Sequence, residues 1–515
     1  MEQVFDIAII GGGINGCGCA ADAALRGLSV VLIEQGDLAS QTSSKSSQLI
    51  HGGLRYLEQL EIGLVKKSLD ERQRLLKLAP HLVRPLPFVI PYLKNKRPWW
   101  MMSAGLFLYD HLSRSNALPK SKGIHRSLLD PYFSPLKQEI QKGFLFYDAT
   151  TDDARLTISN ALLAKTHGAT ILPHTTLTQA KVVQQTWHLS VQSNDRSVIK
   201  SKAVINATGP WVSAVSELLA IPMIHSLSLV KGSHLVIKKR YEGEHAYLLQ
   251  HDDQRIVFTI PYHGHTLIGT TEVPFTGTLH DPHITSEEID YLSEIIHRYF
   301  QRPIHPSEIL STWSGVRPLV ANPNKSAHTL SRDYLCHYSK VPAPAITVYG
   351  GKITTYRQLA KEAINQLKVV FPTLKKSMTE ITPLPGGNLP TASFEDYQQQ
   401  TAKTHAWLDP ATRLRYLRSY GSNIDYLLAG CRQTSDLGLY FAPTLYQIEV
   451  DYLVQNEWAT TAEDILWRRS KCGLVINSEA LQRLNDYLAS SRSSCARMPV
   501  TSATKACCTR SLKVD

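Results

Sequence analysis

Two histidines stand in segments rich in glycine and serine, where a side chain can reach a bound ligand. His51 precedes a Gly-Gly turn, and His234 closes the segment Lys-Gly-Ser-His. Imidazole changes charge near neutral pH, so either side chain suits the removal of a proton from a hydroxyl group. We favour His51 as this base and His234 as an orienting hydrogen-bond donor. A purely structural role for each histidine is the alternative.

Three arginines are candidates for binding an anionic group. Arg317 and Arg332 stand beside turn-forming residues and not in a helical run of charge, and Arg55 follows the Gly-Gly turn after His51. A guanidinium group can donate two parallel hydrogen bonds to phosphate oxygens, so these residues indicate an anionic substrate, and Arg317 is also a candidate catalytic residue. Ordinary surface ion pairs are the alternative. The other candidate substrate contacts are Lys231, Tyr56 and Thr355.

The start of the chain has the pattern of a dinucleotide-binding unit. The apolar run 4–10 is followed by Gly11-x-Gly13-x-x-Gly16, an alanine-rich helical stretch and a second apolar run that ends at Glu34. In such a unit the glycines permit a tight turn, close approach of a diphosphate and close helix packing. Glu34 would accept a hydrogen bond from a ribose hydroxyl and would repel a 2′-phosphate. The motif alone does not distinguish FAD from NAD.

Further motifs make the sequence resemble the aerobic, FAD-dependent glycerol-3-phosphate dehydrogenases. These motifs are TSSKSSQLIHGGLRY at 42–56, NATGPW at 206–211, KGSH at 231–234, GTT at 269–271, SGVRPL at 314–319, SRDY at 331–334, GGKITTYR at 350–357, YGSN at 420–423 and LWRR at 466–469. The resemblance extends over roughly residues 3–490. Glu272 departs from it, because an aspartate is expected at this position, and we assign Glu272 no role.

The resemblance implies that the chain binds FAD and oxidises sn-glycerol 3-phosphate to dihydroxyacetone phosphate, with the electrons passing to membrane ubiquinone or menaquinone. Lys352 would stabilise negative charge on the reduced flavin. The serines at 43–47 would contact the FAD phosphate and ribose, although a polar loop without a ligand is the alternative. The cofactor-binding residues are then Gly11, Gly13, Ile14, Asn15, Gly16, Glu34, Gln35, Ser43, Ser44, Ser46, Ser47, Val182, Gly209, Trp211, Gly351, Lys352, Ile353 and Thr354.

Three other functions remain as alternatives. A glycerol-3-phosphate oxidase would use the same site and pass the electrons to oxygen. An amine or amino-acid oxidase on a related fold is disfavoured, because several arginines occur without an obvious carboxylate for an amine. A protein in which FAD is structural or a redox signal would bind flavin that glycerol 3-phosphate does not reduce.

The order of apolar runs predicts an α/β fold. We expect a Rossmann-like, glutathione-reductase-type FAD domain that is interleaved with a mixed, largely antiparallel substrate domain and followed by a helical domain. The FAD domain would comprise 1–60, 145–215 and 315–370, and the substrate domain 61–144 and 216–314. The helical domain would span 388–490, and 491–515 would be a disordered, serine- and threonine-rich tail.

Composition and charge limit the partners. The net charge of +11 suits an anionic membrane or a phosphorylated substrate, and no motif supports nucleic-acid binding. The start of the chain lacks the features of a signal peptide, and no apolar run is long enough to span a bilayer. We therefore expect a peripheral protein at the cytoplasmic face of the inner membrane, and a homodimer is left open. Cys17 and Cys19 form a CxC that we interpret as helix packing and not as a metal site.

A basic and aromatic segment is the candidate for membrane contact. Lys94, Lys96 and Arg97 precede Trp99-Trp100-Met101-Met102, and further apolar residues follow. Basic residues beside aromatic and apolar side chains are typical of an interfacial helix. A buried helix behind a basic loop would have the same pattern.

Overall fold

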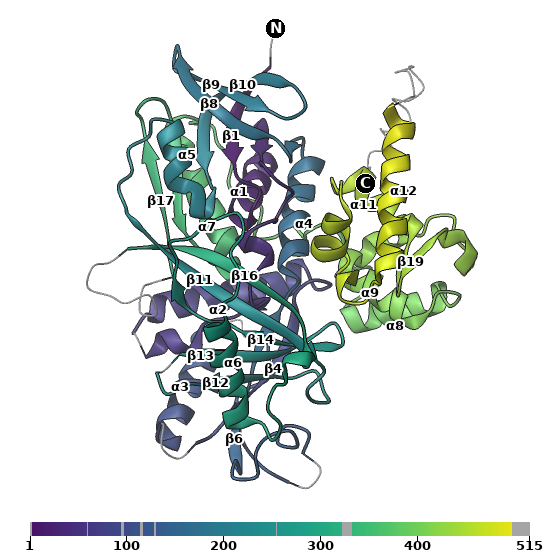
Figure 1. Ribbon diagram of the computed structural model, residues 1–515. Helices are drawn as coiled ribbons and strands as arrows, with labels where there is room; N and C mark the ends of the chain where they lie inside the picture. Colours follow the sequence, from purple (N-terminus) through teal and green to yellow (C-terminus); the bar gives the residue numbers. More distant parts are fainter. Residues whose placement is uncertain are drawn as a thin grey trace.

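The structure is a computed structural model that describes residues 3–58, 60–93, 97–113, 117–127, 130–253, 255–321 and 332–496, with side chains to residue 491. Two large sheets lie against each other, and a group of helices near the C-terminus stands beside them (Figure 1). The first sheet has the strand order β17-β18-β10-β1-β2-β7. The strands of its parallel core are β1 (Val4–Ile10), β2 (Val30–Ile33), β7 (Thr170–Leu172), β10 (Arg196–Asn206) and β18 (Ala345–Gly350).

Parallel pairing brings the carboxyl ends of the core strands to one edge of this sheet. Ile10 lies opposite Ile33 on β2 and opposite Asn206 on β10, so the turns that follow all three strands are neighbours. Antiparallel strands β17 (Tyr334–Ser339), β8 (Thr176–Val183) and β9 (Thr186–Gln192) extend the sheet. Ligands of open parallel sheets bind beyond this edge.

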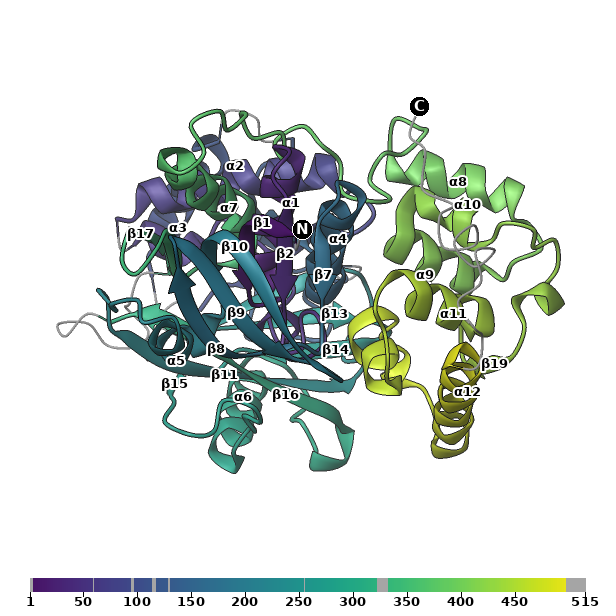
Figure 2. The same cartoon turned by 90° about the horizontal axis from the view of Figure 1, so that it is seen from above.

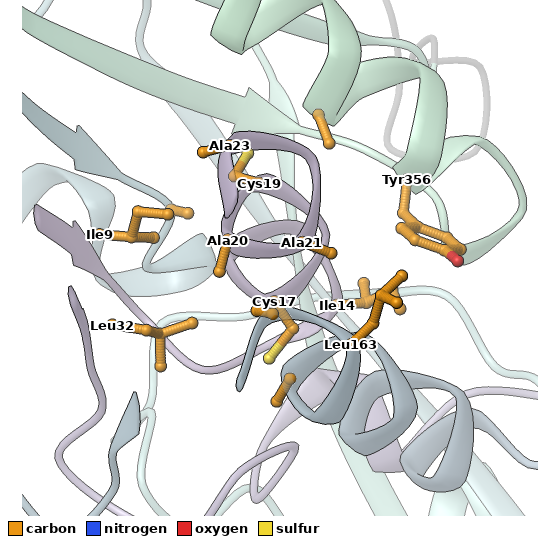
Figure 3. Packing of buried hydrophobic residues seen from close by; sticks show 14 of the residues in the cluster. Ile9, Ile14, Cys17, Cys19, Ala20, Ala21, Ala23, Leu32, Leu163 and Tyr356 are labelled. Atoms are coloured by element: carbon orange, nitrogen blue, oxygen red, sulfur yellow. The ribbon is translucent and has the colours of Figure 1, made fainter. Parts of the chain in front are cut away.

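Helix α1 (Ile14–Leu25) is the centre of the first core. Figure 3 shows α1 between Ile9 and Leu32 of the sheet on one side and Leu163 and Tyr356 on the other. Leu163 belongs to α4 (Asp153–Thr166), and Tyr356 begins α7 (Tyr356–Gln366). Small residues on α1 permit this close approach from three directions. Cys17 and Cys19 are fully buried in it, and burial raises the pKa of both thiols.

The second sheet covers the ligand edge of the first. Its strand order is β15-β11-β14-β13-β12-β4-β6-β3, with β16 on the other side of β11 and β5 on β6. The long strands β11 (Leu227–Lys238) and β16 (Ile309–Val320) pair antiparallel along most of their length. The other strands are β3 (Leu49–Ile50), β4 (Arg84–Pro91), β5 (Lys122–His125), β6 (Lys142–Thr150), β12 (Ala246–Gln250), β13 (Ile256–Tyr262), β14 (His265–Gly269) and β15 (Val273–Pro274).

Several helices pack around the two sheets. They are α2 (Ile62–Leu78), α3 (Trp99–His111), α5 (Val212–Leu218) and α6 (Ser286–Tyr299). The structure confirms the predicted fold class, since the nucleotide-binding sheet is interrupted in sequence by the strands of the second sheet. No helix among the described residues is both long and apolar enough to cross a membrane.

The C-terminal helices have a core of their own. They are α8 (Phe394–Thr404), α9 (Pro410–Tyr420), α10 (Ile424–Leu427), α11 (Gln447–Asn456) and α12 (Ser478–Ala496). This part also contains a small hairpin, β19 (Tyr440–Ala442) with β20 (Leu445–Tyr446), which the sequence did not indicate. Helix α12 continues to Ala496, so the predicted start of the disordered tail at residue 491 is too early in the sequence. Residues 497–515 of that predicted tail lie outside the described residues.

Gly16 offers a test of the packing at the start of α1. A Cβ atom at Gly16 would lie 1.9 Å from the carbonyl oxygen of Gly11, so Gly16→Ala must push the helix away from the glycine turn. We expect this variant to lose FAD during purification and to unfold at lower temperature. Gly63→Ala is the matched control, because nothing lies within 4 Å of its Cβ position in α2. The control should be neutral or more stable by up to about 1 kcal/mol, because alanine favours helix. Equal melting curves for the two variants would contradict the prediction.

Candidate functional site

A cavity of about 440 Å³ lies between the ligand edge of the first sheet and the face of the second. One end reaches Glu34 and Gln35 after β2, and the other reaches Arg317 on β16. Four segments that are distant in sequence supply much of its wall on the side of the first sheet. They are the glycine turn with the start of α1, the serine loop 39–47, the turn 207–211 after β10 and the turn 350–354 after β18.

The glycine turn fits a diphosphate. A Cβ atom at Gly11 would lie 2.7 Å from the carbonyl oxygen of Ala207, so only glycine leaves the backbone this close to the next strand. The N–H of Gly12 donates to Glu34 Oε2 at 2.6 Å, and the N–H of Gly36 donates to Glu34 Oε1 at 2.8 Å. Glu34 thus holds the turn as well as lining the cavity. Its burial raises the pKa of this carboxyl, which the two backbone donors partly offset.

The serine loop closes over the start of α1. Ser43 Oγ accepts the N–H of Ile14 at 3.0 Å, and Ser46 donates from Oγ to Asp153 Oδ2 at 2.7 Å. Ser47 lies 2.9 Å from His234 Nε2. Ser43, Ser46 and Ser47 all line the cavity, where their hydroxyl groups can reach phosphate or ribose oxygens.

The two candidate histidines occupy different layers. His51 lines the cavity, with its ring edge-on to Phe258, whereas His234 is fully buried behind Ser47 and stacked on Trp313. Burial, with Lys352 and Arg332 nearby, lowers the pKa of His51 to about 3, and burial with Arg317 does the same for His234. Both rings are therefore neutral at pH 7. In the structure only His51 borders the space where a substrate can lie.

Four cations surround the end of the cavity beside the second sheet. Arg55, Arg317, Arg332 and Lys352 all line it. Among the described residues, Arg317 Nη1, Arg332 Nε and Lys352 Nζ are buried without a hydrogen-bond partner. Burial lowers the pKa of Arg317 to about 10 and also lowers the pKa of Arg332 and Lys352. Buried cationic donors without a hydrogen-bond partner are costly, so this end of the cavity is suited to an anion.

Glu272, to which the sequence assigned no role, is the carboxylate among these cations. It forms an ion pair with Arg332, and its Oε2 lies 3.6 Å from Arg55 Nη1. It holds two of the three arginines from one side and leaves their remaining donors to the cavity. Its acidic character was visible in the sequence, but nothing there indicated that both arginines would converge on it.

Tyr56 lies under Lys352, whose Nζ is 4.1 Å from the ring centre. Burial raises the pKa of Tyr56, but the cations Arg332, Lys352 and Arg55 together lower it to about 8. The phenol is therefore a strong hydrogen-bond donor within the cavity. The backbone turn that presents Lys352 depends on Gly350 and Gly351, which adopt φ of +71° and +109°.

Six residues that the sequence placed in the site do not line the cavity. They are Gly16, Ser44, Val182, Lys231, His234 and Thr355. Gly16 acts through the packing of α1, and His234 acts through Ser47. Lys231 was misplaced, because its ammonium is 2.9 Å from Glu288 and donates to the carbonyl of His283.

Val182 was also misplaced, because β8 reaches the cavity at Leu177 near its start. Ser44 Oγ donates to the carbonyl oxygen of Gln41, at 3.3 Å, and the neighbouring Thr354 lines the wall in place of Thr355. The other site residues expected from the sequence do line the cavity: Gly11, Gly13, Ile14, Asn15, Glu34, Gln35, Ser43, Ser46, Ser47, His51, Arg55, Tyr56, Gly209, Trp211, Arg317, Arg332, Gly351, Lys352, Ile353 and Thr354.

The geometry fits FAD along the whole cavity. Glu34 and the glycine turn suit the adenosine and diphosphate, and the glycine turn before Lys352 suits the ring that carries charge when reduced. The buried and unpartnered Asn15 Oδ1 and Lys352 Nζ both face this path. Fold and site together define a flavin-dependent oxidoreductase that acts on an anionic substrate.

Similarity to known proteins supports this class of protein. The family described as FAD dependent oxidoreductase matches residues 6–356, and the family described as the C-terminal domain of alpha-glycerophosphate oxidase matches 377–492. A glycerol-3-phosphate dehydrogenase of Pseudomonas aeruginosa is 45% identical over 496 residues, which cover 95% of this chain and 96% of that protein. The chain belongs to the family of FAD-dependent glycerol-3-phosphate dehydrogenases, which confirms the resemblance and the cofactor predicted from the sequence.

Two further comparisons bear on the site. A D-erythritol 1-phosphate dehydrogenase of Brucella abortus is 40% identical over 475 residues, 91% of this chain and 94% of that protein. The solved glycerol-3-phosphate dehydrogenase from Bacillus halodurans, described as complexed with FAD, has a TM-score of 0.74 and 26% identity. It covers 96% of this chain and 91% of that one. The fold is thus shared along nearly the whole chain.

The depressed histidine pKa values predict a pH-dependent stability. Below about pH 6.5 the unfolded chain binds a proton at each histidine, whereas His51 and His234 in the native protein stay neutral down to about pH 3. The unfolded state then binds more protons. The free energy of unfolding should therefore fall with decreasing pH by about 1.4 kcal/mol per pH unit for each histidine.

Urea unfolding between pH 7.5 and 5 measures this slope. His234→Gln should reduce the slope of the unfolding free energy against pH by about 1.4 kcal/mol per pH unit, which corresponds to one proton. His297→Gln, at an exposed position on α6, is the control. An unchanged slope in His234→Gln would show that this ring does not titrate as proposed.

Proposed function

We propose that this protein oxidises sn-glycerol 3-phosphate to dihydroxyacetone phosphate. The observation that carries the proposal is the charge of the cavity end formed by Arg55, Arg317, Arg332, Lys352 and Glu272. Four positive charges and one negative charge leave +3 in a buried space. A phosphate dianion and one negative charge on the reduced cofactor would neutralise it.

His51 is the proposed base. Its ring lies in the cavity wall, and its neutral form can accept the proton of a substrate hydroxyl group. A phosphate dianion among Arg55, Arg332 and Lys352 would cancel the repulsion that these cations exert on a protonated His51. Substrate binding would thus raise the pKa of the base toward the range where proton transfer is efficient.

The remaining residues fix the geometry. Arg317, which donates to Thr270 Oγ1 at 3.2 Å, and Arg332, which pairs with Glu272, bind the phosphate. Tyr56 donates a hydrogen bond to phosphate or hydroxyl oxygen. His234 holds Ser47, and thereby the serine loop, against the cofactor. When bound, FAD accepts the hydride from the carbon that carries the hydroxyl group.

A four-carbon polyol phosphate is a second candidate substrate. The relative of Brucella abortus that is named for D-erythritol 1-phosphate motivates this candidate. Glu272 Oε2 has no hydrogen-bond partner among the described residues, so it could accept a bond from an additional hydroxyl group. Both substrates share the phosphate and the secondary alcohol, so the same mechanism serves either.

Anaerobic flavin reduction tests the activity and its substrate. Glycerol 3-phosphate should bleach the flavin absorbance of the wild-type protein faster than D-erythritol 1-phosphate does.

Arg317→Met should raise the substrate concentration for half-maximal rate by about 10- to 100-fold, because a charged hydrogen bond is lost. His51→Gln should slow reduction by about 10²- to 10⁴-fold. Arg483→Met, an exposed position on α12, is the control.

The electron acceptor is a separate question. We propose a membrane quinone, ubiquinone or menaquinone, and reoxidation of the reduced protein by quinone should be much faster than by oxygen. Rapid stoichiometric peroxide formation would identify an oxidase in its place. Flavin that neither substrate reduces would contradict catalysis altogether.

Helix α3 is the proposed membrane contact. Trp100 is 70% exposed and Phe107 is 65% exposed, and Met101 and Leu108 are exposed on the same face of the helix. Trp99 differs, because it packs on Phe144 with ring centres 3.9 Å apart. The segment is thus half buried and half exposed, and its exposed apolar side chains support the proposed membrane contact. Lys94 and Lys96 lie outside the described residues.

Vesicle flotation tests the membrane contact. Substitution of Trp100 and Phe107 by serine should release the protein from vesicles of anionic lipid, because about 2 kcal/mol or more of apolar burial is lost per side chain. The control replaces Leu439 and Tyr440, which are exposed by 55% and 52% in the C-terminal helical part. Equal flotation of both double variants would exclude α3 as the anchor.

A further inference from the structure

A short segment of the C-terminal helical part reaches the cofactor loops. It comprises Arg468, Arg469, Ser470 and Lys471, all buried, at the end of the helical turn Asp464–Arg469. Figure 2 shows the C-terminal helical part beside helix α4 and strand β7, which belong to the nucleotide-binding part of the molecule. Lys471 adopts φ of +59°, a left-handed conformation that residues other than glycine rarely take. Such strain persists only where surrounding contacts hold it.

The first contact is with the loop after β2. Asp37 accepts hydrogen bonds from Arg468 Nε at 2.6 Å and from Arg469 Nη2 at 2.8 Å. Two residues further on, the N–H of Ala39 donates to the carbonyl oxygen of Gly12, at 3.0 Å. The two arginines thus hold the loop that braces the glycine turn.

The second contact is with the serine loop. Lys471 Nζ lies 3.5 Å from Asp152 Oδ1 and 3.9 Å from Asp153 Oδ1 at the start of α4. Asp153 Oδ2 in turn accepts the backbone N–H of Ser46 at 3.0 Å and its hydroxyl at 2.7 Å. Ser46 lines the cavity, and the next residue, Ser47, contacts His234.

Both contacts are largely buried. The exposed fraction of the side chain is 4% for Lys471, 0% for Asp153, 19% for Asp152 and 1% for Asp37. Removing one partner of a buried ion pair leaves the other charge uncompensated, which is strongly destabilising locally. Loss of the lysine charge would therefore be felt first at Asp153 and at the serine loop that it holds.

We propose that Arg468, Arg469 and Lys471 are positioning residues for the FAD site, through which the C-terminal helical part sets the conformation of the two loops that enclose the cofactor. This inference rests on the FAD dependence of the family and not on the choice of substrate or electron acceptor. It gives the C-terminal part a role in cofactor affinity, although none of its residues lines the described cavity.

FAD titration of the apoprotein tests the proposal without any substrate. Lys471→Met, which keeps the aliphatic length and removes the charge, should weaken FAD binding at least ten-fold and change the visible circular dichroism of the bound flavin. Lys471→Arg should restore most of the affinity and the spectrum. The matched control is Arg415→Met, which breaks the buried pair with Glu449 inside the same helical part, because the described hydrogen bonds of Arg415 go to Thr444 and Glu449 and not to the two loops.

The outcomes are separable. Wild-type FAD affinity in Lys471→Met would overturn the proposal. Equal weakening in Arg415→Met and Lys471→Met would also overturn it, since general destabilisation would then account for both. If Lys471→Met does not accumulate as folded protein, Asp152→Asn removes the other half of the pair and preserves the oxygen that caps α4. Wild-type affinity and spectrum in Asp152→Asn would equally contradict the proposal.

Discussion

The excess of buried positive charge at one end of the cavity is the constraint on which the site depends. Arg55, Arg317, Arg332 and Lys352 converge there, and Glu272 is the carboxylate that pairs with two of them. Burial, with a smaller contribution from repulsion by the neighbouring arginines, lowers the pKa of Arg317 and of Lys352. The arrangement becomes favourable when an anion enters.

Burial and the same charge together explain the protonation state of the proposed base. His51 lies among these cations and stays neutral over the whole physiological range of pH, so it is ready to accept a proton before any substrate is present. A dianionic substrate would both occupy the cations and make His51 more basic. Binding and proton removal are thereby linked through one electrostatic field. His234, in the next layer, is insulated from the cavity by Ser47 and acts on the loop.

The second constraint is the enclosure of the cofactor by loops that have little structure of their own. The loop after β2 and the serine loop contribute few apolar side chains to the core. Their conformations are fixed by polar contacts at the far side, namely Asp37 with two arginines and Ser46 with Asp153. The two arginines belong to the helical part, and Lys471 of the same part pairs with Asp152 and Asp153, so both loops depend on it.

Residue spacing and motifs were sufficient to predict the nucleotide-binding unit, the family and many of the residues that line the cavity. Local spacing suffices for these, because Gly11, Gly13 and Glu34 act within one strand-turn-helix-strand unit, and motifs such as GGKITTYR carry the resemblance. Tertiary structure decided the rest. The sequence placed Lys231 among the substrate contacts, but Glu288 of α6 and the carbonyl oxygen of His283 hold its ammonium group outside the cavity wall.

Glu272 and Lys471 show the converse. Each gains its role from partners far away in the chain, so no local pattern could reveal it. Residues that act within one turn can be read from spacing, whereas residues that act through a buried charge pair are known only when the fold has brought the pair together.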